Sequence, residues 1–91
     1  MCGITGLYNY SDRQVDSKSI IKKIINIQHN RGPDDNGMWE SQCKKIFFGH
    51  NRLSVIDLSP NGKQPFISSD DNFVITFNGE IYNFLELKNE L

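Results

Sequence analysis

The isoleucines between residues 20 and 27 recur with the period of an α-helix, and this spacing constrains the fold more than any other pattern in the chain. Isoleucine is common in strands, but the period indicates a helix with one apolar face. Asp16 or Ser17 precedes the pattern, and both residue types cap helix N-termini. The apolar positions of the predicted helix are Ile20, Ile21, Ile24, Ile25 and Ile27.

Segments rich in apolar and β-branched residues predict strands on both sides of this helix. The first runs from Gly3 to Tyr10, and residues 73–77 (FVITF) give the strongest strand prediction in the chain. Shorter strands are predicted at residues 38–40, 46–50, 53–58 and 80–82. The segments 29–37 and 59–64 are dense in turn-forming residues, which predicts loops.

A second helix is predicted at the C-terminal end. Asn83 is placed to cap it, with Glu86 three residues on in the arrangement of a capping box. Its apolar face would consist of Phe84, Leu87 and Leu91. The order of helices and strands predicts an α+β fold with layered antiparallel sheets rather than a parallel doubly wound sheet. Because the chain stops inside this helix, we expect residues 1–91 to be the first part of a domain.

Charge and composition exclude several classes of function. The net charge of −1 means that the chain has no excess of positive charge to attract nucleic acid or an anionic membrane. Apolar runs are too short for a membrane-spanning helix, and no signal peptide is recognisable, so we expect a cytoplasmic protein. Cys2 and Cys43 are expected to be free thiols, Cys43 in a loop or at a strand edge. His29 and His50 lie far apart without the spacing of zinc ligands, so no metal site is expected.

Cys2 is the sharpest candidate for chemistry. Removal of Met1 would leave a free α-amino group and a thiol on the same residue. Unperturbed, the amine has a pKa of about 7.7–8.0 and the thiol of about 8.5, so a neutral amine is available as a base for its own thiol. N-terminal nucleophiles use this chemistry. The alternative is that Met1 stays in place and Cys2 is simply the second residue.

Three further positions have both a functional and a structural interpretation. The Asn78 side chain and the Gly79 N–H could donate to an oxyanion, although Asn-Gly after an apolar run is also typical of a hairpin turn. Arg52 could bind a carboxylate through two parallel hydrogen bonds, or form a surface salt bridge with Asp57 or another acidic residue. Glu80 could hold a substrate ammonium group or be an ordinary charge at a strand edge.

The segment from Arg31 to Asp34 (RGPD) has a structural interpretation whatever the function. Its residue types predict a rigid turn in which the side chains of Arg31 and Asp34 bridge to neighbouring backbone.

Four blocks of sequence, in this order, resemble the class II glutamine amidotransferase domain of the N-terminal-nucleophile hydrolases. They are residues 1–6 (MCGITG), 31–34 (RGPD) with Gly37, 49–59 (GHNRLSVIDLS) with Gln64-Pro65, and 77–83 (FNGEIYN). The second and fourth blocks are similar to the branch found in glutamine-hydrolysing asparagine synthetases. The resemblance spans nearly all of residues 1–91 and implies the N-terminal part of an αββα layered sandwich with antiparallel sheets.

The resemblance also implies a role for individual residues. Cys2 would attack the side-chain amide of L-glutamine, form a glutamyl thioester and release ammonia. The Asn78 side chain and the Gly79 N–H would form the oxyanion hole. Arg52 would bind the α-carboxylate of the substrate, and Glu80 would help to hold its α-amino group. The backbone around Val55 and Ile56 would line the pocket.

The sequence differs from the family pattern in two respects. Asn30 stands before Arg31 where the family usually has histidine, and His29 lies one place earlier. The ATP-dependent synthetase domain that would use the ammonia is not contained in these residues. The resemblance therefore implies no cofactor for this segment, with ATP and Mg²⁺ belonging to the synthetase domain. A homodimer of the longer protein is compatible with it.

Three hypotheses about function remain open at this point. The chain could be the N-terminal part of a glutaminase domain in asparagine synthesis. It could also be an inactive fragment, or a module that binds glutamine or a partner protein without turnover. An amidotransferase for a different acceptor would have a similar N-terminal part.

Overall fold

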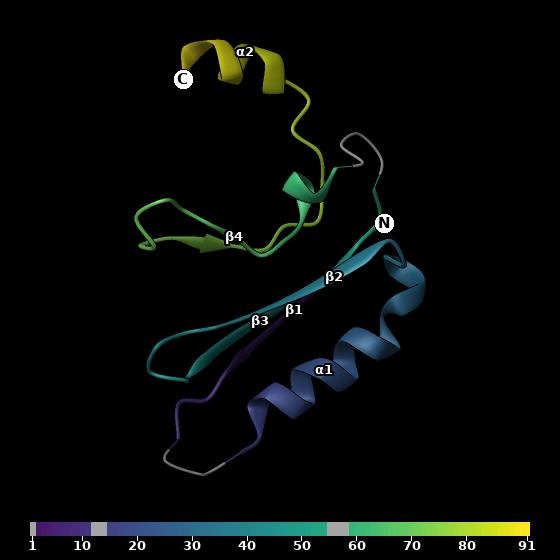
Figure 1. Cartoon of the computed structure of the whole chain (residues 1–91), viewed down its shortest axis with the longest axis vertical. Helices are drawn as coiled ribbons and strands as arrows, with labels where there is room; N and C mark the ends of the chain where they lie inside the picture. The colour runs from purple at the N-terminus through teal and green to yellow at the C-terminus, as the bar shows by residue number, and fades with distance from the viewer. Residues whose placement is uncertain (1, 12–14, 55–58) are drawn as a thin grey trace.

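The computed structural model describes residues 2–11, 15–54 and 59–91 (Figure 1). Within these ranges it has a three-stranded and a two-stranded antiparallel sheet, two α-helices and two short 3-10 helices. This content is that of an α+β fold, as the order of predicted elements indicated. None of the helices in the described ranges is long and apolar enough to cross a membrane.

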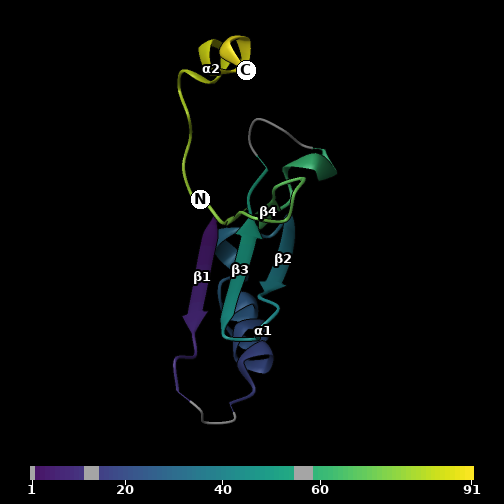
Figure 2. The same ribbon diagram turned by 90° about the vertical axis from the view of Figure 1, so that its left-hand side faces the viewer.

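The larger sheet has the strand order β1-β3-β2, so β3 lies in the centre (Figure 2). Its strands are β1 (Gly3–Tyr8), β2 (Asp35–Glu40) and β3 (Ile46–Arg52). Gly3 of β1 pairs with Asn51, and Asp35 of β2 pairs with Arg52. The start of β1, the start of β2 and the end of β3 therefore meet at one end of the sheet.

Strands β2 and β3 are longer than the sequence patterns predict. β3 continues two residues past His50, and β2 begins three residues before Met38, inside the segment predicted as a loop. The extra residues of one strand pair with those of the other. Pairing with a neighbouring strand thus overrides the turn-forming composition of Asp35, Asn36 and Gly37.

Helix α1 (Ser17–Ile27) packs on one face of this sheet, and Asp16 caps it by accepting a hydrogen bond of 3.1 Å from the Ser19 N–H. Ile21 and Ile25 are buried with Phe47 of β3 and form the core. Gly49 lies beneath them, where an added Cβ would come within 3.2 Å of both isoleucine side chains.

The apolar face of α1 is narrower than predicted. Ile24 is half-buried, Ile20 lies at the rim, and Ile27 has 79% of its surface exposed. The sheet beneath the helix is only three strands wide. Ile27 is also the last residue of α1, where the chain turns into the 3-10 helix η1 (His29–Arg31).

A short hairpin lies on the opposite side of the sheet from α1 (Figure 1). The 3-10 helix η2 (Pro60–Gly62) leads into β4 (Phe66–Ile67), which pairs with β5 (Val74–Ile75). Of the strand predicted at residues 73–77, only Val74 and Ile75 pair with β4. The next pair in this register would be Pro65 and Thr76, and neither residue belongs to the ladder.

Helix α2 (Phe84–Glu90) is the last element and stands apart from the larger sheet (Figures 1 and 2). Asn83 is its N-cap residue, as predicted, but its side chain makes no capping hydrogen bond. The predicted apolar face of Phe84, Leu87 and Leu91 is exposed. The prediction that residues 80–82 form a returning strand is wrong, because they lead directly into this helix.

Candidate functional site

Cys2 lies immediately before β1 and is half-buried. Its sulfur accepts a hydrogen bond from the Leu53 backbone N–H at 3.3 Å and lies 3.8 Å from the Leu53 carbonyl oxygen, to which the thiol can donate. The sulfur thus contacts both the N–H and the carbonyl of Leu53, 51 residues away in the sequence. The structure therefore gives this thiol a defined environment.

The register of the sheet produces this contact. Gly3 pairs with Asn51, so the residue before β1 meets the residues that follow the end of β3. Leu53 is the first residue beyond Arg52, where the strand ladder stops. Its N–H is therefore free to bind a side chain instead of a neighbouring strand.

The turn at residues 31–34 connects the same two segments. Arg31 donates from Nε to the Cys2 carbonyl at 3.3 Å, and Asp34 accepts from the Ser54 N–H at 2.7 Å. The Asp34 N–H in turn donates to the Arg52 carbonyl at 3.0 Å. The prediction that Arg31 and Asp34 bridge to backbone is confirmed, but their partners lie 29 and 20 residues away in the sequence.

Gly32, in the middle of this turn, touches the backbone of β3. An added Cβ would overlap the Asn51 carbonyl and come within 2.6 Å of the Arg52 nitrogen. Only glycine allows so close an approach of two backbones, and this approach places the turn over the end of β3.

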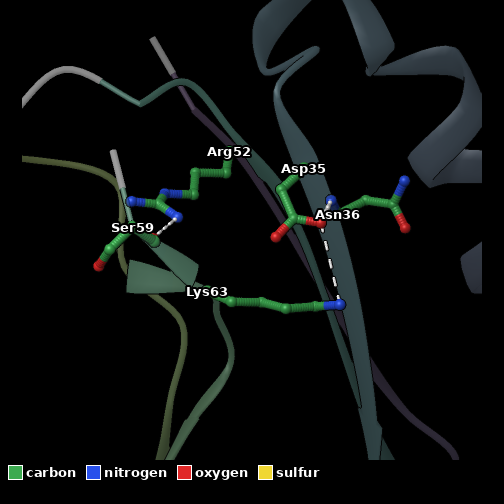
Figure 3. A network of polar contacts seen from close by, with 5 residues as sticks. All are labelled: Asp35, Asn36, Arg52, Ser59 and Lys63. Atoms are coloured by element: carbon green, nitrogen blue, oxygen red, sulfur yellow. Dashed lines mark hydrogen bonds and ion pairs between the residues drawn. The ribbon is translucent and has the colours of Figure 1, made fainter. Parts of the chain in front are cut away.

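Arg52 is the last residue of β3 and is buried, with 7% of its surface exposed. Its Nη1 donates to the Ser59 carbonyl at 2.6 Å (Figure 3). Gly62 packs so closely against the guanidinium that a Cβ there would overlap it. Asp57, the predicted partner of Arg52 in a surface salt bridge, lies outside the described residues. Burial of a guanidinium at the end of the sheet near Cys2 is consistent with binding an anion there.

Asp35 and Lys63 lie next to Arg52 (Figure 3). Asp35 is the strand partner of Arg52, and its carboxylate accepts from the Asn36 N–H at 2.8 Å. The Lys63 ammonium lies 3.8 Å from the same carboxylate oxygen. Because both side chains reach solvent, this ion pair contributes little to stability.

The predicted oxyanion-hole residues Asn78 and Gly79 lie in the segment between β5 and α2. Asn78 is half-buried, whereas Gly79 and Glu80 are exposed. The segment leaves the hairpin at the end of the sheet where β1 begins (Figures 1 and 2). Across the described ranges, neither the Asn78 amide nor the Glu80 carboxylate makes a hydrogen bond or ion pair, so no contact joins them to Cys2.

The predicted pocket residues Val55 and Ile56 lie outside the described residues. The described part of the chain holds no cluster of three or more His, Cys, Asp or Glu side chains that could bind a metal ion.

Sequence reasoning missed two contributors to this region, Leu53 and His50. Leu53 acts through its backbone, and no residue type reveals that. His50 is almost completely buried on β3, and its Nε2 lies 3.1 Å from the Phe77 carbonyl. Burial lowers the pKa of His50, and Arg52 adds to this effect, while the Phe77 contact and Asp35 oppose it. The alternation of side chains along a strand could have placed His50 on the same face as Arg52.

The chain is similar in sequence to a known domain family and to several known proteins. A family model for the glutamine amidotransferase domain matches residues 1–91. The chain is 40% identical to asparagine synthetase 1 (glutamine-hydrolyzing) of Bacillus subtilis over 93 residues, covering all of this chain and 14% of that protein. It is 37% identical to asparagine synthetase 3 of the same organism, covering 15% of it, and 33% identical to amidase chry2 of Gibberella zeae, also covering 15%.

No solved structure matches the chain. The chain spans less than a sixth of the length of each of these three relatives. The family match nevertheless covers every residue from 1 to 91. The chain therefore belongs to the glutamine amidotransferase domain family.

Proposed function

We propose that this chain carries the nucleophile of a glutamine-hydrolysing site and that Cys2 is that nucleophile. The hydrogen bond from the Leu53 N–H to the Cys2 sulfur is the observation that carries the proposal. This contact fixes the thiol beside the end of β3, in the part of the fold where Arg52 also lies. Family membership supplies the substrate class, which is L-glutamine.

The proposed reaction begins with loss of Met1. The free α-amine of Cys2 takes the thiol proton, and the sulfur adds to the side-chain carbonyl carbon of glutamine. The tetrahedral intermediate expels ammonia, which receives the proton from the amine, and leaves a glutamyl thioester. Water then adds to the thioester, releases glutamate and restores the thiol.

The other residues bind the substrate around this centre. Arg52 binds the α-carboxylate through its guanidinium, and its position at the end of β3, beside the start of β1, supports this role. The Asn78 side chain and the Gly79 N–H stabilise the oxyanion, and Glu80 holds the α-amino group. Val55 and Ile56 line the pocket. Asn78 and Glu80 have no other polar partner among the described residues, which leaves both available for substrate.

The ammonia would be used in ATP-dependent asparagine synthesis, in line with the names of the Bacillus relatives. We propose that the acceptor, ATP and Mg²⁺ belong to the part of such proteins that residues 1–91 do not cover, and that this segment needs no cofactor. A cytoplasmic enzyme that assembles as a homodimer is part of the same proposal. The likeness to amidase chry2 supports a second candidate, an amidotransferase with a different acceptor.

The test compares the two cysteines of the chain. Glutamate release from L-glutamine is measured for the wild type, Cys2→Ala and Cys43→Ala. Covalent labelling is measured by intact mass with a glutamine analogue that carries a diazoketone in place of the amide. We expect Cys2→Ala to lose both signals and Cys43→Ala to keep both, because Cys43 is exposed in the β2–β3 turn.

The same mass spectrum reports whether the chain is lighter by one methionine. Equal glutamate release or equal labelling in Cys2→Ala would overturn the nucleophile assignment. Retention of Met1 in an active chain would overturn the role of the α-amine.

A further inference from the structure

Phe77 is held through both of its backbone polar groups by side chains from other parts of the fold. Its N–H donates to Oε1 of Gln64 at 2.6 Å, and its carbonyl lies 3.1 Å from Nε2 of His50. The β4–β5 ladder has already ended at this point. Two side chains therefore replace the strand pairing that would otherwise hold Phe77.

Both side chains belong to residues that are themselves fixed by the larger sheet. His50 has 1% of its surface exposed and pairs in the sheet with Ile4 on one side and Gly37 on the other. Gln64 is half-buried, and its carbonyl lies where a Cβ on Gly37 would be. The absence of a side chain at Gly37 thus lets the Gln64 backbone lie directly on β2.

The contact with His50 fixes the orientation of the peptide bond between Phe77 and Asn78. The Phe77 carbonyl and the Asn78 N–H belong to one planar peptide unit, so fixing the carbonyl fixes the orientation of that plane. The Asn78 Cα lies in the same plane, so the orientation of the plane determines the position from which the Asn78 side chain extends. An oxyanion hole depends on donors that are fixed before the reaction starts.

We propose that His50 and Gln64 are positioning residues that clamp Phe77 and thereby aim the Asn78 amide and the Gly79 N–H at the oxyanion. The proposal rests on the glutamine hydrolysis proposed above. It gives a role to three residues of the family-like blocks that the chemistry itself leaves unused, namely Gly37, His50 and Gln64.

The hydrogen bonding of the two His50 ring nitrogens agrees with this role. To donate to the Phe77 carbonyl, the neutral ring must carry its proton on Nε2, which leaves Nδ1 as an acceptor. Nδ1 is buried and has no hydrogen-bond partner in the described structure. Burial of an unpaired polar atom costs free energy, so a residue with only a packing role would be apolar here.

The experiment uses pairs of variants in the full chain. His50→Leu and Gln64→Leu remove one half of the clamp each, whereas His50→Gln keeps an N–H donor and Gln64→Glu keeps an acceptor oxygen. We expect kcat for glutamate release to fall about 10- to 100-fold in each leucine variant, below the roughly 100- to 1,000-fold loss seen when an oxyanion donor itself is removed. We expect KM to stay within about twofold, because the clamp acts on the transition state.

Two further measurements separate positioning from general damage. Alkylation of Cys2 by iodoacetamide should proceed at the wild-type rate in all four variants, since the Leu53 contact is elsewhere. Amide hydrogen exchange of a peptide covering residues 76–82 should be faster in the leucine variants and close to wild type in His50→Gln and Gln64→Glu. The conservative variants should also recover most of the lost kcat.

The outcomes are distinguishable from failure of the proposed function. If the wild type releases no glutamate but exchange rises in the leucine variants, the clamp stands and the glutaminase assignment fails. Unchanged exchange at residues 76–82 overturns the clamp whatever the activity. A leucine variant with wild-type kcat, or one that loses Cys2 alkylation together with kcat, also overturns the positioning role.

Discussion

The Leu53 N–H donates a hydrogen bond of 3.3 Å to the sulfur of Cys2, joining the start of β1 to the residue just past the end of β3. Arg31 and Asp34 bind the backbone on either side of this contact. Within the described residues the thiol itself contacts the Leu53 backbone, while the turn holds the backbone of Cys2 and Ser54 on either side.

The first prediction concerns the Leu53 N–H. Leu53→Pro removes this donor, so alkylation of Cys2 by iodoacetamide should slow several-fold because the thiolate loses its hydrogen bond. Leu53→Ala keeps the N–H and should react at the wild-type rate. The rates are measured by intact mass in a Cys43→Ala background, where Cys2 is the remaining thiol. Equal rates for the proline and alanine variants would contradict the role of this contact.

A second prediction concerns the close approach at Gly32. Gly32→Ala places a Cβ against the Asn51 carbonyl and 2.6 Å from the Arg52 nitrogen, and backbone cannot move aside as a side chain can. We expect a loss of about 1–3 kcal/mol in the free energy of unfolding, measured by urea denaturation. Gly6→Ala is the control, since its Cβ would be 3.8 Å from the Phe48 ring, an ordinary contact. A loss as large in Gly6→Ala would show that the approach at Gly32 is not special.

The third prediction tests which face of α1 is the core. Ile21 is fully buried against Phe47 and Gly49, so Ile21→Ala should lower the free energy of unfolding by about 2–5 kcal/mol. Ile27 is exposed, and Ile27→Ala should change it by less than about 0.5 kcal/mol. Both values come from urea denaturation monitored through Trp39 fluorescence. Similar losses at the two positions would mean that the apolar face is as wide as the isoleucine spacing predicts.

The fourth prediction is a pH dependence of stability caused by His50. Burial lowers the pKa of His50 below its ordinary value near 6.5, an effect to which Arg52 adds and which the Phe77 carbonyl and Asp35 oppose. The unfolded chain therefore binds a proton at this residue before the folded chain does. The stability is complete above about pH 6.5 and decreases as the pH falls from there to the folded-state pKa.

The measurement is the free energy of unfolding in urea between about pH 7.5 and pH 5. Replacement by glutamine removes the titrating group, so His50→Gln should lose part of this decrease. His29 lies on the surface in η1, and His29→Gln should keep the decrease seen in the wild type. A pH profile of His50→Gln identical to that of the wild type would exclude His50 as the cause.

Much of the first half of the fold was predictable from local sequence patterns. The strand β1 and the helix α1 follow from spacing and residue type, and the structure chose Asp16 from the two cap candidates that the sequence offered. The second half was less predictable. Residues 73–77 have strong strand composition, but only Val74 and Ile75 pair with β4 in the described structure, and composition does not show where a partner strand ends.

The candidate site also has residues that the sequence revealed and residues that only the structure revealed. Cys2 and Arg52 were singled out from the sequence, and the structure places both at one end of the sheet. The roles of Asn78, Gly79 and Glu80 remain predictions, since these residues make no polar contact with Cys2 across the described ranges. His50 and Gln64 became visible as a pair only through the backbone of Phe77.

The sequence by itself determined the family, the candidate nucleophile and the position of the first strand and helix, because these depend on residue type and on short-range spacing. Only the tertiary structure decided that Leu53 faces Cys2 and that His50 and Gln64 hold Phe77. Every residue except proline has the same backbone N–H and carbonyl. Which of these groups is left for a side chain depends on where the strand ladders stop, and that is set by pairing between distant segments.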